Sequence, residues 1–220
     1  MTNRFKIDDA FFEDKVNEVK EGYPFPNKGA KVPLCMDIGA NVGAWSMLFS
    51  EYCTELVSVE PYKPNYDFMV SKFKELGINN ITIYNKAIST KDGEKIQITI
   101  EEGNKDSGSI SSNDDISDSP KEVLGEVETI SYSHLYEKYP NVGYLKVDCE
   151  GCEWDLLMDS KLDHIKILVV EMHPGFLGRK KVMKLKNYLG TQFKNVYSRK
   201  DLIGEVMIFS NMKTPLTINT

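Results

Sequence analysis

The stretch Asp37-Ile38-Gly39-Ala40-Asn41-Val42-Gly43 decides the fold of this chain. It completes the apolar run 32–38, which predicts a buried strand that enters a tight turn. Gly39 lets the backbone turn sharply, and Gly43 lets the next helix pack closely against the strand. The apolar residues that follow recur at helical spacing, as on one face of a helix: Trp45, Leu48, Phe49 and Tyr52.

The same alternation of strand and helix continues after this turn. Residues 56–59 form a second apolar run that ends in Glu60 and Pro61, and residues 81–84 form a third. Between these runs, apolar side chains predict a helix that stops at Gly77: Tyr66, Met69, Val70 and Phe73. Strands and helices that alternate with short connections predict a doubly wound, Rossmann-like α/β fold.

The second half of the chain predicts two more core strands and a C-terminal hairpin. Residues 144–148 and 165–172 are apolar runs, and a helix is expected from about 179 to 189. Residues 193–198 and 205–211 predict an antiparallel hairpin. We therefore expect a sheet that is mostly parallel and has an antiparallel part at its C-terminal end.

Two segments lie outside this core pattern. Segment 1–33 predicts an N-terminal helix followed by an irregular connector, since apolar residues recur at helical spacing as far as Val19. Segment 93–131 predicts a β insertion, in which the Ser- and Asp-rich residues 103–120 are expected to form a mobile loop. This loop is either a lid or recognition element for the substrate or a disordered insertion without function. We treat residues 1–220 as a single domain.

Composition excludes several classes of partner. The net charge is −6, with 33 acidic and 27 basic residues and no basic block, so a nucleic acid partner is not expected. No stretch approaches ~18 uncharged apolar residues, so a membrane partner is not expected either. The N-terminus has no apolar run of signal-peptide length, and four cysteines are too few for a disulfide scaffold. These features predict a cytoplasmic protein.

The turn after the first strand predicts a nucleoside cofactor. Glu60 lies 17 residues after Gly43, at the end of the second strand, where its carboxylate can accept both hydroxyls of a ribose. A dinucleotide site needs glycine where this chain has Asn41, because a side chain there crowds the pyrophosphate. S-adenosylmethionine has no phosphate, and Asp37 and Asn41 suit its amino acid end. An NAD-dependent oxidoreductase is the alternative, and a glycine turn that merely joins strand to helix is a further one.

These motifs resemble a known family. Residues 37–43 are similar to motif I of class I methyltransferases, and Val59-Glu60-Pro61 is similar to the acidic residue of motif II. Residues 145–153 (LKVDCEGCE) closely resemble the Lys-Ile-Asp-Val-Glu-Gly-x-Glu segment of the FkbM-like methyltransferases. Glu171-Met172-His173 is similar to that family's Glu-x-His. The matches follow the family's order over roughly residues 34–175.

The resemblance implies an activity and a set of cofactor residues. It implies O-methylation of a hydroxyl with S-adenosylmethionine, often on a sugar or natural product, so the expected partner is a small-molecule or glycan acceptor. Gly39, Asn41 and Glu60, with Lys86 and Ala87 in the turn after the third strand, would hold the cofactor. A cofactor-binding module without catalysis, within a larger glycan-modifying protein or assembly, is the alternative.

Four side chains at the ends of the fourth and fifth strands are the candidates for the chemistry. These are Asp148, Glu150, Glu171 and His173. We predict His173 as the general base for the acceptor hydroxyl, because an imidazole titrates near neutral pH. A histidine that caps the strand end and bonds to the backbone is the structural alternative.

The carboxylates among these residues have a second interpretation. Asp148 and Glu171 end adjacent strands, so with His173 they could share a magnesium or manganese ion. Alternatively, Asp148 is the N-cap of the next helix, and Glu150 and Glu153 stabilise the helix dipole. Lys146 is expected to pair with one of these acids.

Cys149-Glu150-Gly151-Cys152 is a CxxC motif between a strand and a helix. A thioredoxin-like redox pair would occupy such a position. Zinc would need two more ligands, and Cys35 and Cys53 do not form a second CxxC. The resembled family has small apolar residues here, so we interpret the two thiols as substitutes for them.

Overall fold

The computed structural model describes residues 6–26, 31–101, 111–112, 120–158, 160, 162–200 and 205–212. The helices are α1 (Asp9–Gly22), α2 (Ala44–Phe49), the 3₁₀ turn η1 (Ser50–Tyr52), α3 (Lys63–Glu75), α4 (Tyr132–Lys138), α5 (Glu153–Leu157), α6 (Pro174–Leu177) and α7 (Arg179–Gln192). The strands are β1 (Val32–Ile38), β2 (Cys53–Val59), β3 (Ile81–Tyr84), β4 (Ala87–Ser89), β5 (Lys95–Glu101), β6 (Ser111–Ser112), β7 (Lys121–Ser131), β8 (Val142–Val147), β9 (Ile167–Met172), β10 (Asn195–Lys200) and β11 (Glu205–Ser210).

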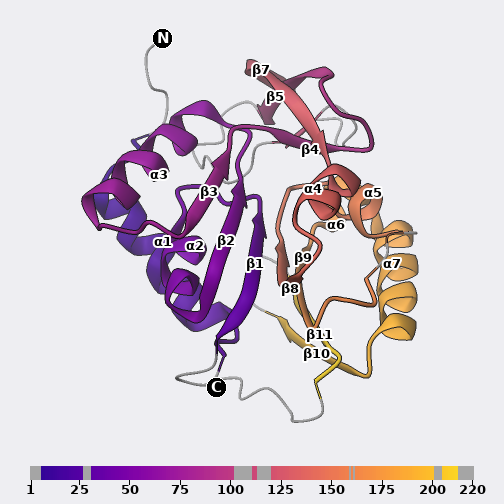
Figure 1. Ribbon diagram of the computed structural model, residues 1–220. Helices are drawn as coiled ribbons and strands as arrows, with labels where there is room; N and C mark the ends of the chain where they lie inside the picture. Colours follow the sequence, from indigo (N-terminus) through magenta and orange to yellow (C-terminus); the bar gives the residue numbers. More distant parts are fainter. Residues whose placement is uncertain are drawn as a thin grey trace.

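A seven-stranded sheet forms the centre of the molecule (Figure 1), in the order β10-β11-β9-β8-β1-β2-β3. Strands β3, β2, β1, β8 and β9 pair in parallel, and β11 is antiparallel to both of its neighbours. This confirms the predicted doubly wound α/β fold with an antiparallel C-terminal part. The strand order reverses between β1 and β8, which is the place where such folds bind ligands.

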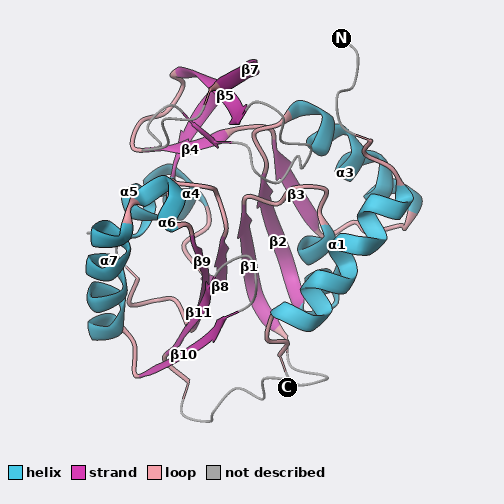
Figure 2. Ribbon diagram, turned by 180° about the vertical axis from the view of Figure 1, so that it is seen from behind, coloured by secondary structure: helices cyan, strands magenta, loops and turns pink. Residues whose placement is uncertain are grey.

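Helices cover both faces of this sheet (Figure 2). One face packs against α1 and α2, and the other packs against α4, α5, α6 and α7. In α1 the buried residues are those at the predicted helical spacing: Phe12, Val16 and Val19. The helix predicted before Gly77 is confirmed as α3, which buries Met69 and Phe73 and leaves Val70 40% exposed.

The predicted β insertion is a second, smaller sheet with the order β4-β7-β5-β6. It begins before residue 93, because β4 pairs in parallel with β7. Ile98 and Ile100 of β5 are buried. Within the predicted mobile loop 103–120, Ser111–Ser112 pair with β5, and residues 103–110 and 113–119 lie outside the described residues.

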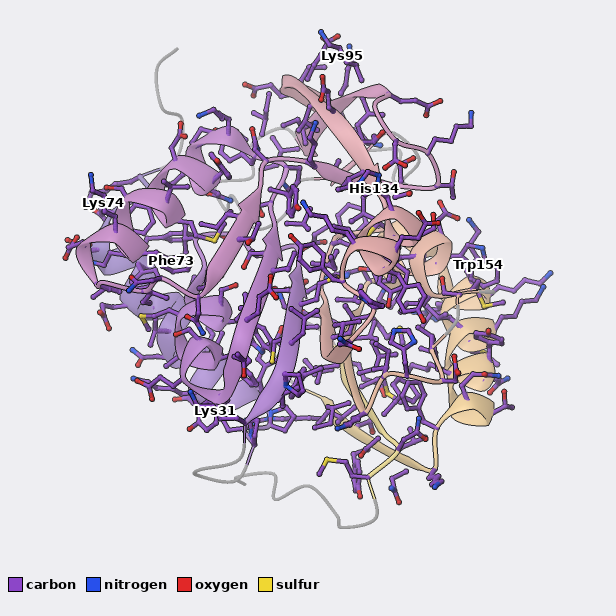
Figure 3. All side chains as sticks on the ribbon, viewed as in Figure 1. Lys31, Phe73, Lys74, Lys95, His134 and Trp154 are labelled. Carbon is purple, nitrogen blue, oxygen red and sulfur yellow. A yellow bond between two sulfur atoms is a disulfide. The ribbon has the colours of Figure 1, made fainter. Side chains whose placement is uncertain are left out.

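The turn between β1 and α2 depends on Gly43. Its φ is +84°, and a Cβ atom there would lie 2.6 Å from the Phe73 ring and 2.7 Å from the Met69 side chain. Phe73 points from α3 toward the sheet (Figure 3) and is 3% exposed. A side chain at position 43 would therefore separate α3 from the cofactor turn.

Over the described part of the chain, no helix is long and apolar enough to cross a bilayer.

Candidate active site

The Gly39–Gly43 turn lies directly against the end of β8. Gly39 has φ +77°, and a Cβ atom on it would be 1.7 Å from the carbonyl oxygen of Asp148. The backbone N–H groups of Gly39 and Ala40 both donate to the Val59 carbonyl at the end of β2, at 3.0 Å. The predicted cofactor turn therefore joins the ends of three strands, and only glycine fits at position 39.

Glu60 is buried at the end of β2, where it fixes two loops. Its Oε2 accepts from the backbone N–H of Asn41 at 2.8 Å, and its Oε1 accepts from the N–H of Tyr62 at 2.9 Å. Burial raises the pKa of Glu60 to about 8, although these two N–H groups favour the ionised form. Asn65 Nδ2 also donates to Oε1, at 3.4 Å, so Oε2 is the oxygen that keeps a lone pair for a ribose hydroxyl.

Asn85 is a site residue that the sequence reasoning missed. Its Nδ2 donates to the carbonyls of Glu60 and Pro61, each at 2.9 Å, and so holds the loop after β2 against the end of β3. An asparagine directly after an apolar run is the signal that could have found it.

Lys146 is the central cation of the site. Its Nζ lies 3.1 Å from Asp37 Oδ1 and 3.2 Å from Asp148 Oδ2, and it donates to the Gly39 carbonyl at 2.8 Å. Ser46 of α2 donates to the other oxygen of Asp37 at 2.6 Å. The predicted pairing of Lys146 with one of the acids at the strand ends is confirmed for Asp148, and its ion pair with Asp37 was not predicted. Oδ1 of Asp37 faces Lys146 without a hydrogen bond among the described residues, and the role of Asp37 as a cofactor ligand stays a prediction.

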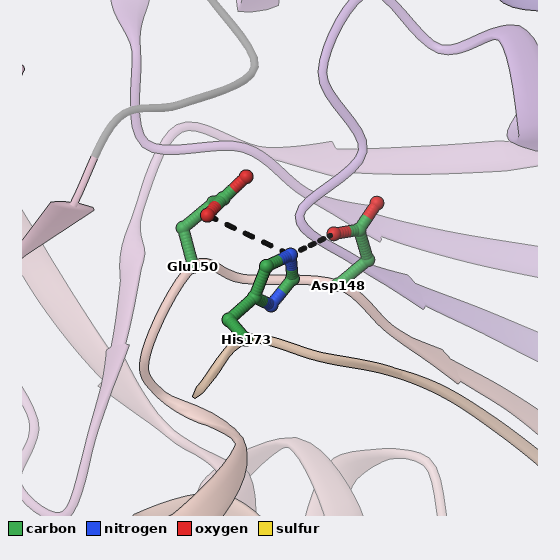
Figure 4. Close-up of side chains that lie close together, drawn as sticks. All are labelled: Asp148, Glu150 and His173. Carbon is green, nitrogen blue, oxygen red and sulfur yellow. Dashed lines mark ion pairs between the residues drawn. The ribbon is translucent and has the colours of Figure 1, made fainter. Parts of the chain in front are cut away.

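The chemistry candidates gather around His173, which follows β9 (Figure 4). Its Nδ1 lies 2.6 Å from Glu153 Oε1. Its Nε2 faces three further carboxylates, at 3.6 Å from Asp148 Oδ1, 3.6 Å from Glu150 Oε2 and 3.9 Å from Glu171 Oε1. The four predicted residues therefore do meet at the ends of β8 and β9. Glu153, which has no exposed surface, was not predicted as the partner of His173.

The carboxylates control the protonation of this cluster. Burial alone would lower the pKa of His173, but the hydrogen bond with Glu153 and the charge of Glu150 raise it to about 10. Burial raises the pKa of Glu150 to about 8. Burial also acts to raise the pKa of Asp148, but the charges of Lys146 and His173 and the hydrogen bond with Lys146 together keep that pKa below its usual range. In the ligand-free protein at neutral pH, His173 is therefore an imidazolium.

The structural alternatives considered for two of these residues are wrong. His173 does not end the strand by bonding its side chain to the backbone, since its ring pairs with Glu153. Asp148 is not a helix N-cap, because Cys152 occupies that position in α5. Instead, the Asp148 carboxylate forms an ion pair with Lys146.

The interpretation of the CxxC thiols as substitutes for small apolar residues is also wrong. Cys149 and Cys152 form a disulfide, with their Cα atoms 5.5 Å apart. The chain turns back between them because Glu150 and Gly151 both have positive φ, +52° and +118°. A left-handed glutamate cannot be foreseen from residue type.

A second unpredicted contact comes from the segment after α1. The Tyr23 hydroxyl donates to Glu171 Oε2 at 3.4 Å, so the N-terminal segment contacts one of the carboxylates around His173, which we call the acceptor side of the site.

One group of side chains could hold a divalent cation. Asp148, Glu150 and His173 each offer a ligand atom, and these atoms lie within 4.8 Å of one another. The sequence suggested Asp148, Glu171 and His173 as the ligands, whereas this group contains Glu150 in place of Glu171. A metal site that uses Asp148 and Glu171 stays a prediction. Carboxylate and imidazole ligands suit magnesium or manganese.

Lys86 and Ala87 belong to the small sheet. Lys86 forms an ion pair with Glu128 of β7, and Ala87 begins β4 with 6% of its surface exposed. Their role in cofactor binding stays a prediction.

Comparison with known proteins adds the family. The sequence matches the methyltransferase FkbM domain over residues 37–199, from the cofactor turn to β10. The chain belongs to the FkbM methyltransferase domain family. It is therefore an S-adenosylmethionine-dependent methyltransferase domain, as the motifs predicted. The alternative of an NAD-dependent oxidoreductase was wrong. Among curated proteins, none matches this chain.

Solved structures share the fold. An rRNA methylase from Streptococcus thermophilus is 8% identical, with a TM-score of 0.52, and the match covers 83% of this chain and 89% of that chain. A candidate methyltransferase from Streptococcus mutans, in complex with SAH, is 10% identical, with a TM-score of 0.50 and coverage of 82% and 90%. A match to the YcgJ protein of Bacillus subtilis covers 36% of this chain and 30% of that one, with a TM-score of 0.26.

The residues at the turn fit S-adenosylmethionine. Gly39 has no side chain, and the Asp148 carbonyl fills the place of its Cβ atom, so the turn lies directly against the end of β8. The buried Oδ1 of Asn41 has no hydrogen-bond partner within the described residues, so it can accept from a ligand donor. Gly39, Asn41, Gly43 and Glu60 would therefore hold the cofactor, with no pyrophosphate to accommodate beside Asn41.

The ion pairs of Lys146 generate a stability prediction. Lys146→Met should lower the free energy of unfolding by about 3–5 kcal/mol, because it leaves two close carboxylates without their cation. Urea denaturation followed by circular dichroism measures the change. Lys166→Met is the matched control: that side chain is exposed between β8 and β9, and its loss should cost under about 0.5 kcal/mol. Equal effects of the two substitutions would contradict the assigned role of Lys146.

Proposed function

We propose that this domain methylates a hydroxyl group of a sugar or glycan. The observation that carries the proposal is the cluster around His173, which lies at the ends of β8 and β9, beside the cofactor turn. When bound, S-adenosylmethionine supplies a methyl group on a positively charged sulfur. Methyl transfer is an in-line displacement, so the protein has to align the acceptor oxygen and take up its proton.

His173 is suited to accept the hydroxyl proton. Glu153 holds Nδ1, which leaves Nε2 as the nitrogen that faces the other side chains of the site. In the ligand-free protein the surrounding carboxylates keep His173 protonated, with a pKa of about 10. His173 would lose this proton before it acts as a base, and a positively charged cofactor at the neighbouring turn would favour that loss. Nε2 would then take up the proton that the acceptor hydroxyl loses on methylation.

The charge of the cluster favours a neutral acceptor. Asp148, Glu153 and Glu171 lie near His173, and Glu150, with a pKa of about 8, adds its charge as the pH rises, so these acidic surroundings disfavour phosphate or carboxylate groups. Carboxylates accept hydrogen bonds from several hydroxyls at once, as an uncharged sugar would offer. The acidic cluster therefore supports a polyhydroxyl acceptor.

A metal-assisted route is the second candidate, favoured by the grouping of Asp148, Glu150 and His173. A cation there would occupy Nε2 and lower the pKa of the acceptor hydroxyl directly. A cofactor-binding module without catalysis is the remaining alternative. Such a protein would bind the cofactor and leave every acceptor unmethylated.

A panel of acceptors tests the reaction class. We expect label from methyl-labelled cofactor to appear on neutral sugars or glycan fragments, read by mass spectrometry, and not on sugar phosphates or uronic acids. Label on anionic sugars, or on none of the acceptors, would reject the proposed acceptor class.

The pKa of Glu60 generates a pH prediction. Ribose hydroxyls donate to an ionised carboxylate, so binding favours loss of the proton from Glu60, whose pKa is about 8. Cofactor affinity, measured by calorimetry, should therefore rise with pH and level off above about pH 8. In Glu60→Gln the affinity should be lower throughout, and this part of the pH dependence should vanish. If wild type and Glu60→Gln have parallel pH profiles, Glu60 does not bind the ribose.

The base role of His173 predicts a selective loss of turnover. His173→Ala should reduce the rate of methyl transfer ~10²–10⁴-fold and keep the affinity for the cofactor. His134→Ala is the control, since His134 is half exposed and pairs with Asp92 at the small sheet. A wild-type rate in His173→Ala would remove His173 from the mechanism. Loss of the wild-type rate in the presence of a chelator would favour the metal-assisted route.

A further inference from the structure

The methyl transfer proposed above makes no use of the disulfide between Cys149 and Cys152. We propose that these cysteines form a reversible thiol–disulfide pair that holds Glu150 at His173 and thereby controls the acceptor half of the site. The effect on turnover rests on the proposed function. The bond itself and its effect on the loop do not.

The disulfide closes the loop that carries Glu150. Glu150 has φ +52° and Gly151 has φ +118°, both in the region that L residues rarely adopt. Glycine tolerates this conformation, but in glutamate the Cβ atom crowds the backbone carbonyl and raises the free energy of the loop. A covalent link between the residues on either side restricts the loop to the turned-back conformation. Without the link, Glu150 is expected to return to ordinary backbone angles.

This loop contacts Nε2 of the His173 ring directly, and it supports the contact that Glu153 makes with Nδ1. The Glu150 carboxylate lies 3.6 Å from Nε2. The backbone N–H of Gly151 donates to Glu153 Oε2 at 3.0 Å, and the other oxygen of Glu153 binds Nδ1 at 2.6 Å. Opening the loop therefore loosens the direct contact at Nε2 and the support of the contact at Nδ1.

The two pairs of cysteines differ in their access to solvent. Cys149 and Cys152 are partly buried at the margin of the core, whereas Cys35 and Cys53 have no exposed surface. A dissolved dithiol can therefore reach the disulfide and leaves the other two thiols untouched. Cys35 and Cys53 serve as an internal control.

The redox step balances with a dithiol as the reductant. A thiolate of the dithiol attacks one sulfur of the Cys149–Cys152 bond, forms a mixed disulfide and releases the other sulfur as a thiolate. The second thiol of the reductant then displaces the remaining cysteine. Two electrons and two protons pass to the protein, which gains two thiols, and the reductant becomes a cyclic disulfide.

The test compares oxidised and reduced protein in three measurements. Alkylation followed by peptide mapping should label Cys149 and Cys152 only after reduction, and should leave Cys35 and Cys53 unlabelled. Amide hydrogen exchange in the peptide spanning residues 149–153 should become faster on reduction. The rate of methyl transfer should fall about tenfold, which converts to about 1.4 kcal/mol, and return on reoxidation. Cofactor affinity should not change, because Glu60 lies outside the loop.

The variant Cys149→Ser/Cys152→Ser should show the faster exchange and the lower methyl-transfer rate of the reduced protein. Addition of reductant should change neither value. An equal response of variant and wild type to reductant would overturn the proposal. So would labelling of Cys149 and Cys152 without reduction, or exchange in 149–153 that is independent of the redox state. If no acceptor is methylated in either state, the proposed function fails, and the alkylation and exchange measurements still decide the inference.

Discussion

The buried charge of Lys146 is the interaction on which the site depends. Lys146 lies between Asp37 of β1 and Asp148 after β8, and it also binds the Gly39 carbonyl. It therefore links the cofactor turn to the acceptor side at the point where the strand order reverses. Buried carboxylates at such close range repel each other unless a cation lies between them, so the arrangement of the strand ends requires this lysine.

The strand ends were predictable from the sequence, and the side-chain pairings were not. Asp148, Glu171 and His173 meet because the carboxyl ends of adjacent parallel strands lie at one edge of a sheet, which follows from the apolar runs alone. That Glu153 binds His173 depends on a loop with two positive φ angles, and residue type does not specify such a turn at Glu150. Charge explains the remaining difference: the imidazole expected to titrate near neutral pH has a pKa of about 10, because the carboxylates around it outweigh the lowering effect of burial.

The antiparallel C-terminal hairpin was predicted from its two runs, but its position in the sheet was not. Local patterns identify strands, whereas the choice of neighbour depends on contacts between distant residues. Strand β11 enters between β9 and β10, and Val206 pairs with Glu171.

This placement has a consequence for the order of assembly. The strand that supports Glu171 has β11 as one neighbour, and β11 is the last strand of the described chain to be synthesised. Until β11 leaves the ribosome, β9 presents a bare edge, and Glu171 stands on a strand without half of its hydrogen bonds. Nascent chains should therefore gain the cofactor turn early, and the acceptor side only after β11 has left the ribosome.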